Sequence, residues 1–364
     1  MLFLGENWYG SCARACCMAL RRLGCDVTDI DVQTMFPQMR RRSSRALIRL
    51  IRPRLIREYN ELIIDTASRF KPEMLLAFKG AFVEPNTLGL LRQMGVRLYN
   101  YYPDRSPFGE ECLFLESMWQ YDCVFYTKCY WREEVLLGRF RDSVFVPHGY
   151  DPEIHLPCGL DEVLDGYRHD VTVVATHTAN KEDTLERTLG AMPSLDLAIW
   201  GNGWERCRAK RVAHCIQGYA VNGWAYAAAL SAARINMAIM SGVVPGVAQG
   251  DETTTRTYEI PACGGFMLHE RSPELLRLFE EDKEVACFAS PNEAAAKIEY
   301  YLARPEEREA IADAGHRRCV PAYSYDNRMA EILRWHYGKE RGETAGDDGR
   351  STANQCNGRY IRAF

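Results

Sequence analysis

The stretch GDETTTRTYEIPACGGF, residues 250–266, brings two acids and one arginine together in the sequence. Asp251 and Glu259 are separated by seven residues, and Arg256 lies between them. The apolar run 258–263 predicts the start of a helix, and a helix N-terminus beside an arginine attracts anions such as phosphate. Carboxylates repel phosphate but accept hydrogen bonds from sugar hydroxyls. These residue types therefore predict a site for a nucleotide sugar.

The overall composition is that of an ordinary globular protein. The chain has 364 residues, 47% of them hydrophobic and 26% charged, and its formal net charge is -4. This length favours two domains, and the mild acidity argues against a dedicated nucleic-acid binder. The 14 cysteines show no repeated pair at zinc spacing and lie in apolar stretches, which favours free thiols over disulfides. No stretch has the features of a signal peptide or a membrane span, so we expect a cytoplasmic protein.

Short apolar runs alternate with amphipathic stretches, which is typical of βα units and mostly parallel sheets. The candidate strands are 2–5, 25–30, 74–78, 96–102, 123–127 and 143–147, followed by 171–177, 195–201, 214–219, 235–240, 264–270 and 285–289. A proline-marked stretch between the two sets separates two domains, which we assign to residues 1–150 and 151–338. The second domain ends in two or three helices, and residues 339–364 predict a flexible tail.

The segment RTYEIPACGGFML, together with residues 278–315, resembles glycosyltransferase group 1 proteins of the GT-B fold, and more narrowly their CgeB-like branch. The resemblance continues through KPEMLLAFKG, YNYYPDRSPFG, YDCVFYTKCYWREEVLLG, VFVPHGYDPEIHLP and YSYDNRMAEIL, so it covers most of residues 1–336. It implies two facing Rossmann-like α/β domains, with a C-terminal helix that returns to the N-terminal domain. The second domain would bind the nucleotide sugar and the first the acceptor.

The resemblance also implies roles for the charged residues. Retaining members of the superfamily carry a Glu-x7-Glu motif whose first acid faces the donor sugar and whose second holds the ribose. Asp251 and Glu259 occupy these positions, and the shorter Asp251 leaves the identity of the sugar open. In this family the first turn of the C-terminal domain binds the diphosphate. The resemblance therefore assigns Thr176 and Lys181 to the diphosphate, with Arg256 as a second cation beside Lys181.

Two loops, WGNGW and IQGYAVNGW, resemble those that enclose the base of the donor. Gly201 and Gly218 would allow close backbone approach, and Tyr219 would offer main-chain groups to the base edge. Tight turns after strands are the alternative for both glycines. Tyr258, at the start of the predicted helix, is assigned to the donor side as well.

The remaining candidates belong to the acceptor half. Gly5 and Gly10 lie in the loop after the first strand, and Lys79 follows another strand. Asp104 is a candidate catalytic group because it comes at the end of a strand, although a turn-forming aspartate is the alternative. His148 lies in the crossover between the domains, where a structural histidine is the alternative to an acceptor contact.

The sequence therefore predicts a hexosyl- or related glycosyltransferase that uses a UDP- or GDP-sugar type of donor. We expect retention of configuration and no cofactor, with Arg256 and Lys181 in place of a metal, because no D-x-D motif stands where one is needed. The acceptor stays open among a glycan, a small molecule, a protein and a nucleic acid, as does the oligomeric state. One alternative is a degenerate protein that binds a nucleotide sugar or glycan without transfer. Another is a nucleic-acid or membrane adaptor that contacts an anionic surface through the arginine-rich residues 40–57.

Overall fold

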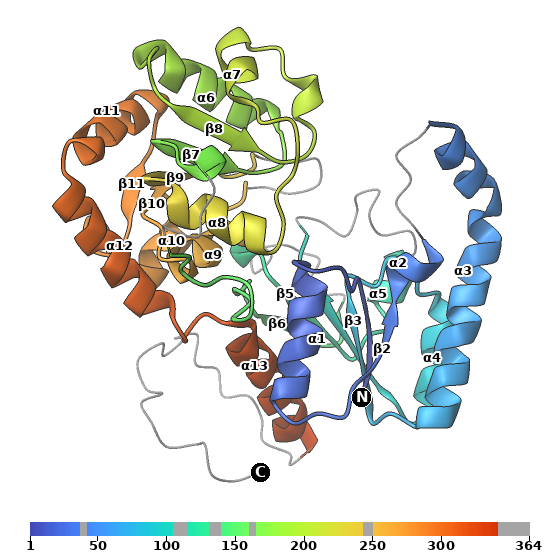
Figure 1. Cartoon of the computed structure of the whole chain (residues 1–364). Helices are drawn as coiled ribbons and strands as arrows, with labels where there is room; N and C mark the ends of the chain where they lie inside the picture. Colours follow the sequence, from blue (N-terminus) through green and yellow to red (C-terminus); the bar gives the residue numbers. More distant parts are fainter. Residues whose placement is uncertain (37–41, 105–114, 131–139, 160–164, 243–249, 341–364) are drawn as a thin grey trace.

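The computed structural model has two α/β domains, each built on its own parallel sheet (Figure 1). It describes residues 1–36, 42–104, 115–130, 140–159, 165–242 and 250–340. The strands of the first sheet are β1 (Leu2–Gly5), β2 (Thr28–Asp31), β3 (Met74–Phe78), β4 (Arg97–Tyr102), β5 (Cys123–Tyr126) and β6 (Ser143–Phe145). Those of the second are β7 (Val171–Val174), β8 (Leu197–Trp200), β9 (Ile235–Ala238), β10 (Met267–Glu270) and β11 (Ala286–Phe288).

Both sheets reverse their strand order at an equivalent place. The spatial orders are β2-β1-β3-β4-β5-β6 and β11-β10-β9-β7-β8, and all neighbouring strands are parallel. The order reverses between β1 and β3 in the first sheet and between β7 and β9 in the second. We call these two places the switch points. Ligands of open α/β sheets bind outside the carboxyl ends of the strands at such points.

Helices cover both faces of each sheet. Around the first sheet lie α1 (Cys12–Arg22), α2 (Val32–Met35), α3 (Arg42–Phe70), α4 (Pro85–Gln93) and α5 (Leu115–Met118). Around the second lie α6 (Ala179–Ala191), α7 (Lys210–Cys215), α8 (Trp224–Ala232), α9 (Arg256–Ala262), α10 (Pro273–Leu278), α11 (Pro291–Leu302) and α12 (Pro305–Cys319), and the described chain ends with α13 (Tyr325–Glu340). The predicted α/β class with two Rossmann-like domains is confirmed.

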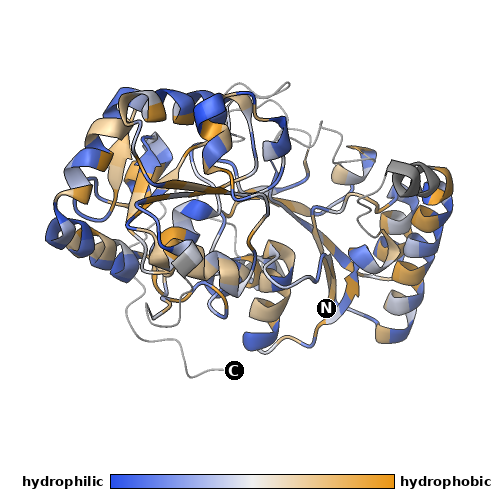
Figure 2. Ribbon diagram, turned by 45° about the horizontal axis from the view of Figure 1, so that its top comes forward, coloured by the Kyte–Doolittle hydropathy of each residue, from blue (hydrophilic) through white to orange (hydrophobic). Residues whose placement is uncertain are grey.

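Side chains alternate along each strand between two cores, as the pleat of a β-strand requires. In β1, Leu2 and Leu4 pack in the core that includes α3 and α4, whereas Phe3 packs in the core that includes α1. In β7, Val173 packs with α6 and Val174 with the core of α8 and α9. Figure 2 shows the result, with hydrophobic strands inside and hydrophilic residues on the outer faces of the helices.

Helix α13 returns to the first domain. Tyr325, Met329 and Ile332 are buried in the same core as α1 and the first sheet. At the surface, Arg22 of α1 donates to the carboxylate of Asp326 at 3.0 Å. The predicted return of the C-terminal helix is therefore confirmed, and the described part of the chain begins and ends on the same domain.

Several predicted boundaries differ from the structure. The predicted strand 214–219 is wrong, because α7 continues to Cys215 and Ile216 then makes only an isolated bridge to Ile199. Helix α13 continues to Glu340, one residue past the predicted start of the tail at 339. The rest of the predicted tail, residues 341–364, lies outside the described residues.

The arginine-rich stretch forms the first half of α3. This helix continues through Pro53, since loss of a single N–H leaves the flanking turns hydrogen-bonded. Arg40 and Arg41 lie outside the described residues. Within the described ranges, no helix combines the length and apolar character needed to cross a bilayer.

Candidate functional site

Arg256 lies at the switch point of the second sheet. Strands β7 and β9 pair there only at Val171 with Ile235 and at Thr172 with Asn236. Toward the carboxyl ends, the guanidinium donates from Nη1 to the carbonyl of Val174 at 3.3 Å and from Nη2 to that of Ile239 at 2.9 Å. The arginine therefore joins the two strand ends and satisfies two carbonyls that would otherwise be buried without a donor.

This position of Arg256 differs from the expected one. Helix α9 begins at Arg256, two residues before the predicted start, and the side chain is buried. The fork of the side chain bonds to backbone carbonyls rather than to the neighbouring acids Glu252 and Glu259. Contact with a phosphate stays a prediction for this residue.

Lys181 is a second buried cation at the same switch point. It lies in the first turn of α6, and its Nζ donates to the carbonyl of Thr176 at 3.1 Å and to Oγ of Ser241 at 3.2 Å. Thr176 follows β7 and is exposed, whereas Ser241 follows β9. Lys181 therefore links the segments after the same two strands that Arg256 joins.

Glu259 is held by a tyrosine and faced by a histidine. The hydroxyl of Tyr226 on α8 donates to Oε2 at 2.5 Å, and Nε2 of His155 lies 3.8 Å from Oε1. Nδ1 of His155 accepts from the backbone N–H of Asp151 at 2.9 Å, so the ring proton is on Nε2, toward Glu259. One carboxylate oxygen is thus firmly bonded, and the other has a neighbour beyond hydrogen-bond distance.

Asp251 connects this site to the first domain. Its Oδ1 lies 3.1 Å from Nζ of Lys128, which comes two residues after β5, and both side chains are buried. The backbone N–H of Asp251 donates to the carbonyl of Ser241 at 3.0 Å. Asp251 is therefore next to the Lys181 contact in the second domain and next to a lysine of the first.

Burial sets the protonation of the groups around Glu259. It lowers the pKa of Arg256, although Tyr226, Glu259 and Asp251 act in the opposite direction, and an arginine stays charged in proteins. Burial, reinforced by Glu259, raises the pKa of the Tyr226 phenol well above its ordinary value. Burial lowers the pKa of His155, opposed by Glu259 and Asp151. At neutral pH the tyrosine is therefore a neutral donor and the histidine is uncharged.

Three polar atoms in the segment 251–256 are buried without a hydrogen-bond partner among the described residues: Oδ1 of Asp251, Oγ1 of Thr254 and Nε of Arg256. Buried polar atoms in proteins are almost always hydrogen-bonded, so such a cluster requires an explanation. A ligand that carries both hydroxyl donors and oxygen acceptors would supply these bonds. The candidate site is therefore centred on this segment and on the switch point beside it.

The loop after β8 is also close to the switch point. A Cβ on Gly201, which has φ +139°, would lie 2.1 Å from the carbonyl oxygen of Ala175 after β7, so only glycine fits. Gly218 has φ +81° and open space around it. The exposed Tyr219 places its ring edge-on to Trp200, and its carbonyl accepts from the N–H of Gly201 at 3.3 Å. Contact with a base stays a prediction for all three.

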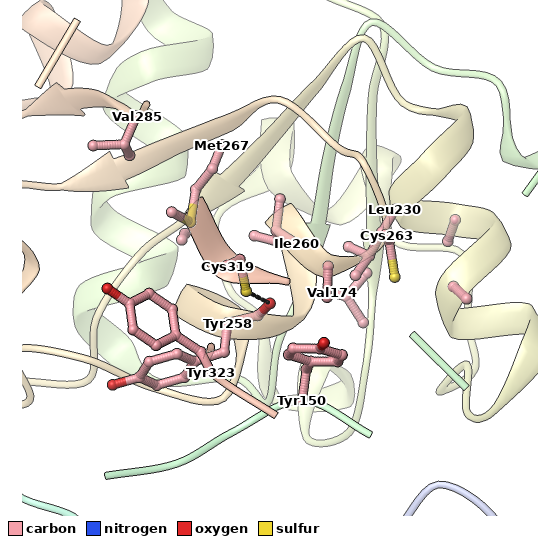
Figure 3. Close-up of a cluster of buried hydrophobic side chains, with 14 of the residues drawn as sticks. Tyr150, Val174, Leu230, Tyr258, Ile260, Cys263, Met267, Val285, Cys319 and Tyr323 are labelled. Carbon is pink, nitrogen blue, oxygen red and sulfur yellow. Dashed lines mark hydrogen bonds between the residues drawn. The ribbon is translucent and has the colours of Figure 1, made fainter. Parts of the chain in front are cut away.

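Tyr258 is not at the surface of this site. Its side chain is fully buried in the core behind α9, where its ring lies edge-on to Tyr323. Figure 3 shows it among Tyr150, Tyr323 and Cys319, whose Sγ donates to the carbonyl of Tyr258 at 3.3 Å. Burial in this aromatic core differs from the direct donor contact that we expected.

The predicted residues of the first domain lie in a surface ion pair, in the loop after β1 and in the buried crossover between the domains. Lys79 forms an ion pair with Asp104 at 2.6 Å in which both side chains are partly exposed. Gly5 ends β1, and Gly10 in the following loop lies against Gly223 at the start of α8, so this loop touches the second domain. The ring of His148 is buried, and burial together with the nearby charge of Lys128 lowers its pKa well below the ordinary value.

Sequence reasoning missed Lys128, Tyr226 and His155. Lys128 had a usable signal, because it follows a buried strand and so reaches the carboxyl edge of the first sheet. Tyr226 and His155 gave none, since a helix residue and a crossover residue meet Glu259 only after the chain has folded.

Two surface cavities lie away from the candidate site. One of about 310 Å³, lined by Arg97, Arg141, Trp335 and neighbours, is at the amino ends of β4 and β5, and one of about 380 Å³ lies on α11 and α12. The chemistry of the site rests on its residues rather than on these cavities. Among the described residues, no three His, Cys, Asp or Glu side chains group closely enough to hold a metal ion.

The second half of the chain is similar to known proteins. Residues 181–334 match the model of a family described as "Glycosyl transferase-like". Over 81 residues the chain is 28% identical to the spore protein CgeB of Bacillus subtilis, a match that spans 22% of this chain and 24% of that protein. The CgeB-like branch therefore rests on a short stretch, and the chain matches about a quarter of that curated relative.

Solved structures match nearly the whole chain. Sucrose-phosphate synthase from Thermosynechococcus elongatus has a TM-score of 0.63 at 14% identity, over 94% of this chain and 99% of that one. Anabaena HepE, solved in complex with UDP and glucose, has a TM-score of 0.61 at 10% identity, over 93% of this chain and 100% of that one. A glycosyltransferase from Rickettsia africae scores 0.62 at 10% identity, over 94% and 99% of the two chains. These similarities establish the fold.

Proposed function

From a GT-B fold and a C-terminal half that matches the glycosyl transferase-like family, we propose that this protein transfers a sugar from a nucleoside diphosphate sugar to an acceptor. The observation that carries the proposal is the convergence at the β7/β9 switch point. There, two buried cations link the strand ends, and two acids lie on the adjacent segment. Positive charge for a diphosphate and carboxylates for hydroxyl groups are what such a donor requires.

Each residue has a role in this proposal. Glu259 holds the ribose, because its Oε1 lies 3.8 Å from Nε2 of His155, beyond hydrogen-bond distance, while Tyr226 fixes Oε2. Asp251 accepts a hydroxyl of the sugar at its unsatisfied Oδ1. Lys181 and Arg256 place positive charge beside the diphosphate, whose negative charge grows when the glycosidic bond breaks.

The reaction breaks the bond between the anomeric carbon and a phosphate oxygen, which keeps the electron pair. The acceptor hydroxyl oxygen forms the new bond to that carbon, and its proton passes to the leaving diphosphate. We propose that the two cations stabilise the leaving diphosphate without a metal and that configuration is retained. The UDP complexes of Anabaena HepE make UDP-sugars the first donors to test, while the acceptor is left to experiment.

The test is calorimetry with UDP, GDP and their sugars, combined with measurement of released nucleoside diphosphate. Glu259→Gln should weaken binding of the free nucleoside diphosphate by about 10- to 100-fold, the scale of a hydrogen bond to a charged group. The amide oxygen of glutamine can still accept from Tyr226, so the fold should persist. Glu293→Gln, which alters an ion pair with Arg271 at the start of α11, is the matched control.

Two results would contradict the proposal. If the wild type binds no nucleoside diphosphate or nucleotide sugar of the panel, the donor assignment fails. If it binds a nucleotide sugar but releases no product with or without candidate acceptors, the protein is a binding protein rather than a transferase.

A further inference from the structure

The ion pair between Lys128 and Asp251 joins the two domains inside the protein. Nζ of Lys128 lies 3.1 Å from Oδ1 of Asp251, and the two side chains are only 7% and 5% exposed. Lys128 belongs to the segment after β5, whereas Asp251 precedes α9. We propose that Lys128 is a positioning residue of the donor site, which acts through Asp251 on recognition of the sugar. This inference rests on the function proposed above.

A buried carboxylate needs a compensating cation, and the surroundings of Asp251 leave this task to Lys128. The charge of Arg256 is near, but two nitrogens of its fork donate to Val174 and Ile239. Lys181 donates to Thr176 and Ser241. Within the described residues, the direct ion pair of Asp251 is with Lys128, so removal of the lysine would leave a buried negative charge uncompensated.

The ion pair compensates the charge of Asp251 but leaves its carboxylate able to accept a further hydrogen bond. Oδ1 is buried and accepts no hydrogen bond among the described residues, although the ammonium of Lys128 lies at ion-pair distance. The carboxylate can therefore still accept a hydrogen bond from a hydroxyl group. Lys128 holds Asp251 in position for that contact.

The inference separates the two ends of the donor. Glu259 is anchored by Tyr226 of the second domain and does not depend on Lys128. Loss of Lys128 should therefore affect the sugar end of the donor and leave the nucleoside diphosphate end unchanged. A lysine that only stabilised the fold would affect both ends alike or neither.

The experiment compares the best-binding nucleotide sugar from a panel of UDP- and GDP-sugars with its free nucleoside diphosphate, using wild type and Lys128→Met. The nucleotide sugar should bind about tenfold more weakly to the variant, the scale of one hydrogen bond to a charged group, and the free nucleoside diphosphate should bind as before. Lys128→Arg, which keeps the charge, should restore part of the loss. Lys297→Met, which removes a Lys–Asp pair on α11, is the matched control and should change neither affinity.

A double variant tests whether Lys128 acts through Asp251. On an Asp251→Asn background, Lys128→Met should cause no further loss of nucleotide-sugar affinity, because the group that it positions is already altered. The double variant also removes both buried charges, so it keeps the test available if Lys128→Met alone does not fold.

The outcomes are distinguishable. If the wild type binds donor and Lys128→Met binds both ligands as the wild type does, only the role of Lys128 is overturned. Additive losses in the double variant would also overturn it, because the lysine would then act on the donor directly. If the wild type binds no nucleotide sugar, the proposed function falls as well.

Discussion

The two sheets have equivalent switch points that are occupied by different chemistry. At β7/β9, Arg256 and Lys181 are buried and bonded to the segments after both strands. Beside the first switch point, at the carboxyl ends of β3 and β4, Lys79 pairs with Asp104, and both side chains are about one third exposed. The same type of strand order therefore carries different charged groups in the two domains. The second switch point has the features of a site that binds a charged ligand, and the first those of a more adaptable surface.

Removal of Arg256 from the second switch point should have the largest effect on turnover and stability. In Arg256→Ala, the carbonyls of Val174 and Ile239 lose their donor and the site loses a positive charge. We expect turnover of the donor to fall about 100- to 1000-fold and the free energy of unfolding to fall by about 3 kcal/mol. Arg256→Lys should recover only part of both, because an ammonium cannot replace the planar fork.

Donor hydrolysis and urea unfolding of both Arg256 variants check this expectation. Circular dichroism shows first whether each variant is folded. Turnover and stability close to the wild type in the alanine variant would mean that the bridge across the switch point is dispensable.

Two glycines with positive φ, one in each domain, allow the effect of close backbone approach at the second switch point to be measured. In Gly201→Ala, the new methyl group would meet the carbonyl oxygen of Ala175 at 2.1 Å, and the φ of +139° is unfavourable as well. Gly95 of the first domain has φ +83° but open space around it. We expect about 2 to 3 kcal/mol of destabilisation at Gly201 and about 1 kcal/mol at Gly95. Equal losses in chemical denaturation would show that close approach of the backbone is unimportant there.

The smallest effect should come from Lys79. Its pair with Asp104 is accessible to water, which weakens the interaction between the two charges. Lys79→Ala should therefore lower the free energy of unfolding by less than about 1 kcal/mol. A loss as large as that for Arg256→Ala would mean that the two switch points are more alike than their burial indicates.

Most of the fold followed from local patterns in the sequence. Apolar runs such as 74–78 and 123–127 mark strands because their residues are buried on both faces of a sheet. The run 214–219 failed because a six-residue helix and an isolated bridge produce the same short apolar signal as a strand. Pattern alone cannot separate these two cases.

The candidate site could be predicted only in part. The spacing of Asp251 and Glu259 is local, so the sequence contains it directly. The partners of these acids come from segments far along the chain, which meet only in the folded protein, as Lys128 and Tyr226 do. The burial of Arg256 and Tyr258 depends in the same way on tertiary packing, which the local sequence does not contain.

The return of α13 to the first domain has a consequence for biosynthesis. Arg22 and Asp326 are 304 residues apart in the chain, yet they belong to neighbouring helices of one domain. At about 5 to 20 residues per second, a ribosome that has made α1 needs on the order of 15 to 60 seconds to reach α13. The second domain, synthesised later, can complete its core before the first, whose α1 exposes an apolar face until α13 has been synthesised. During that interval the nascent chain exposes apolar surface of the kind that promotes aggregation.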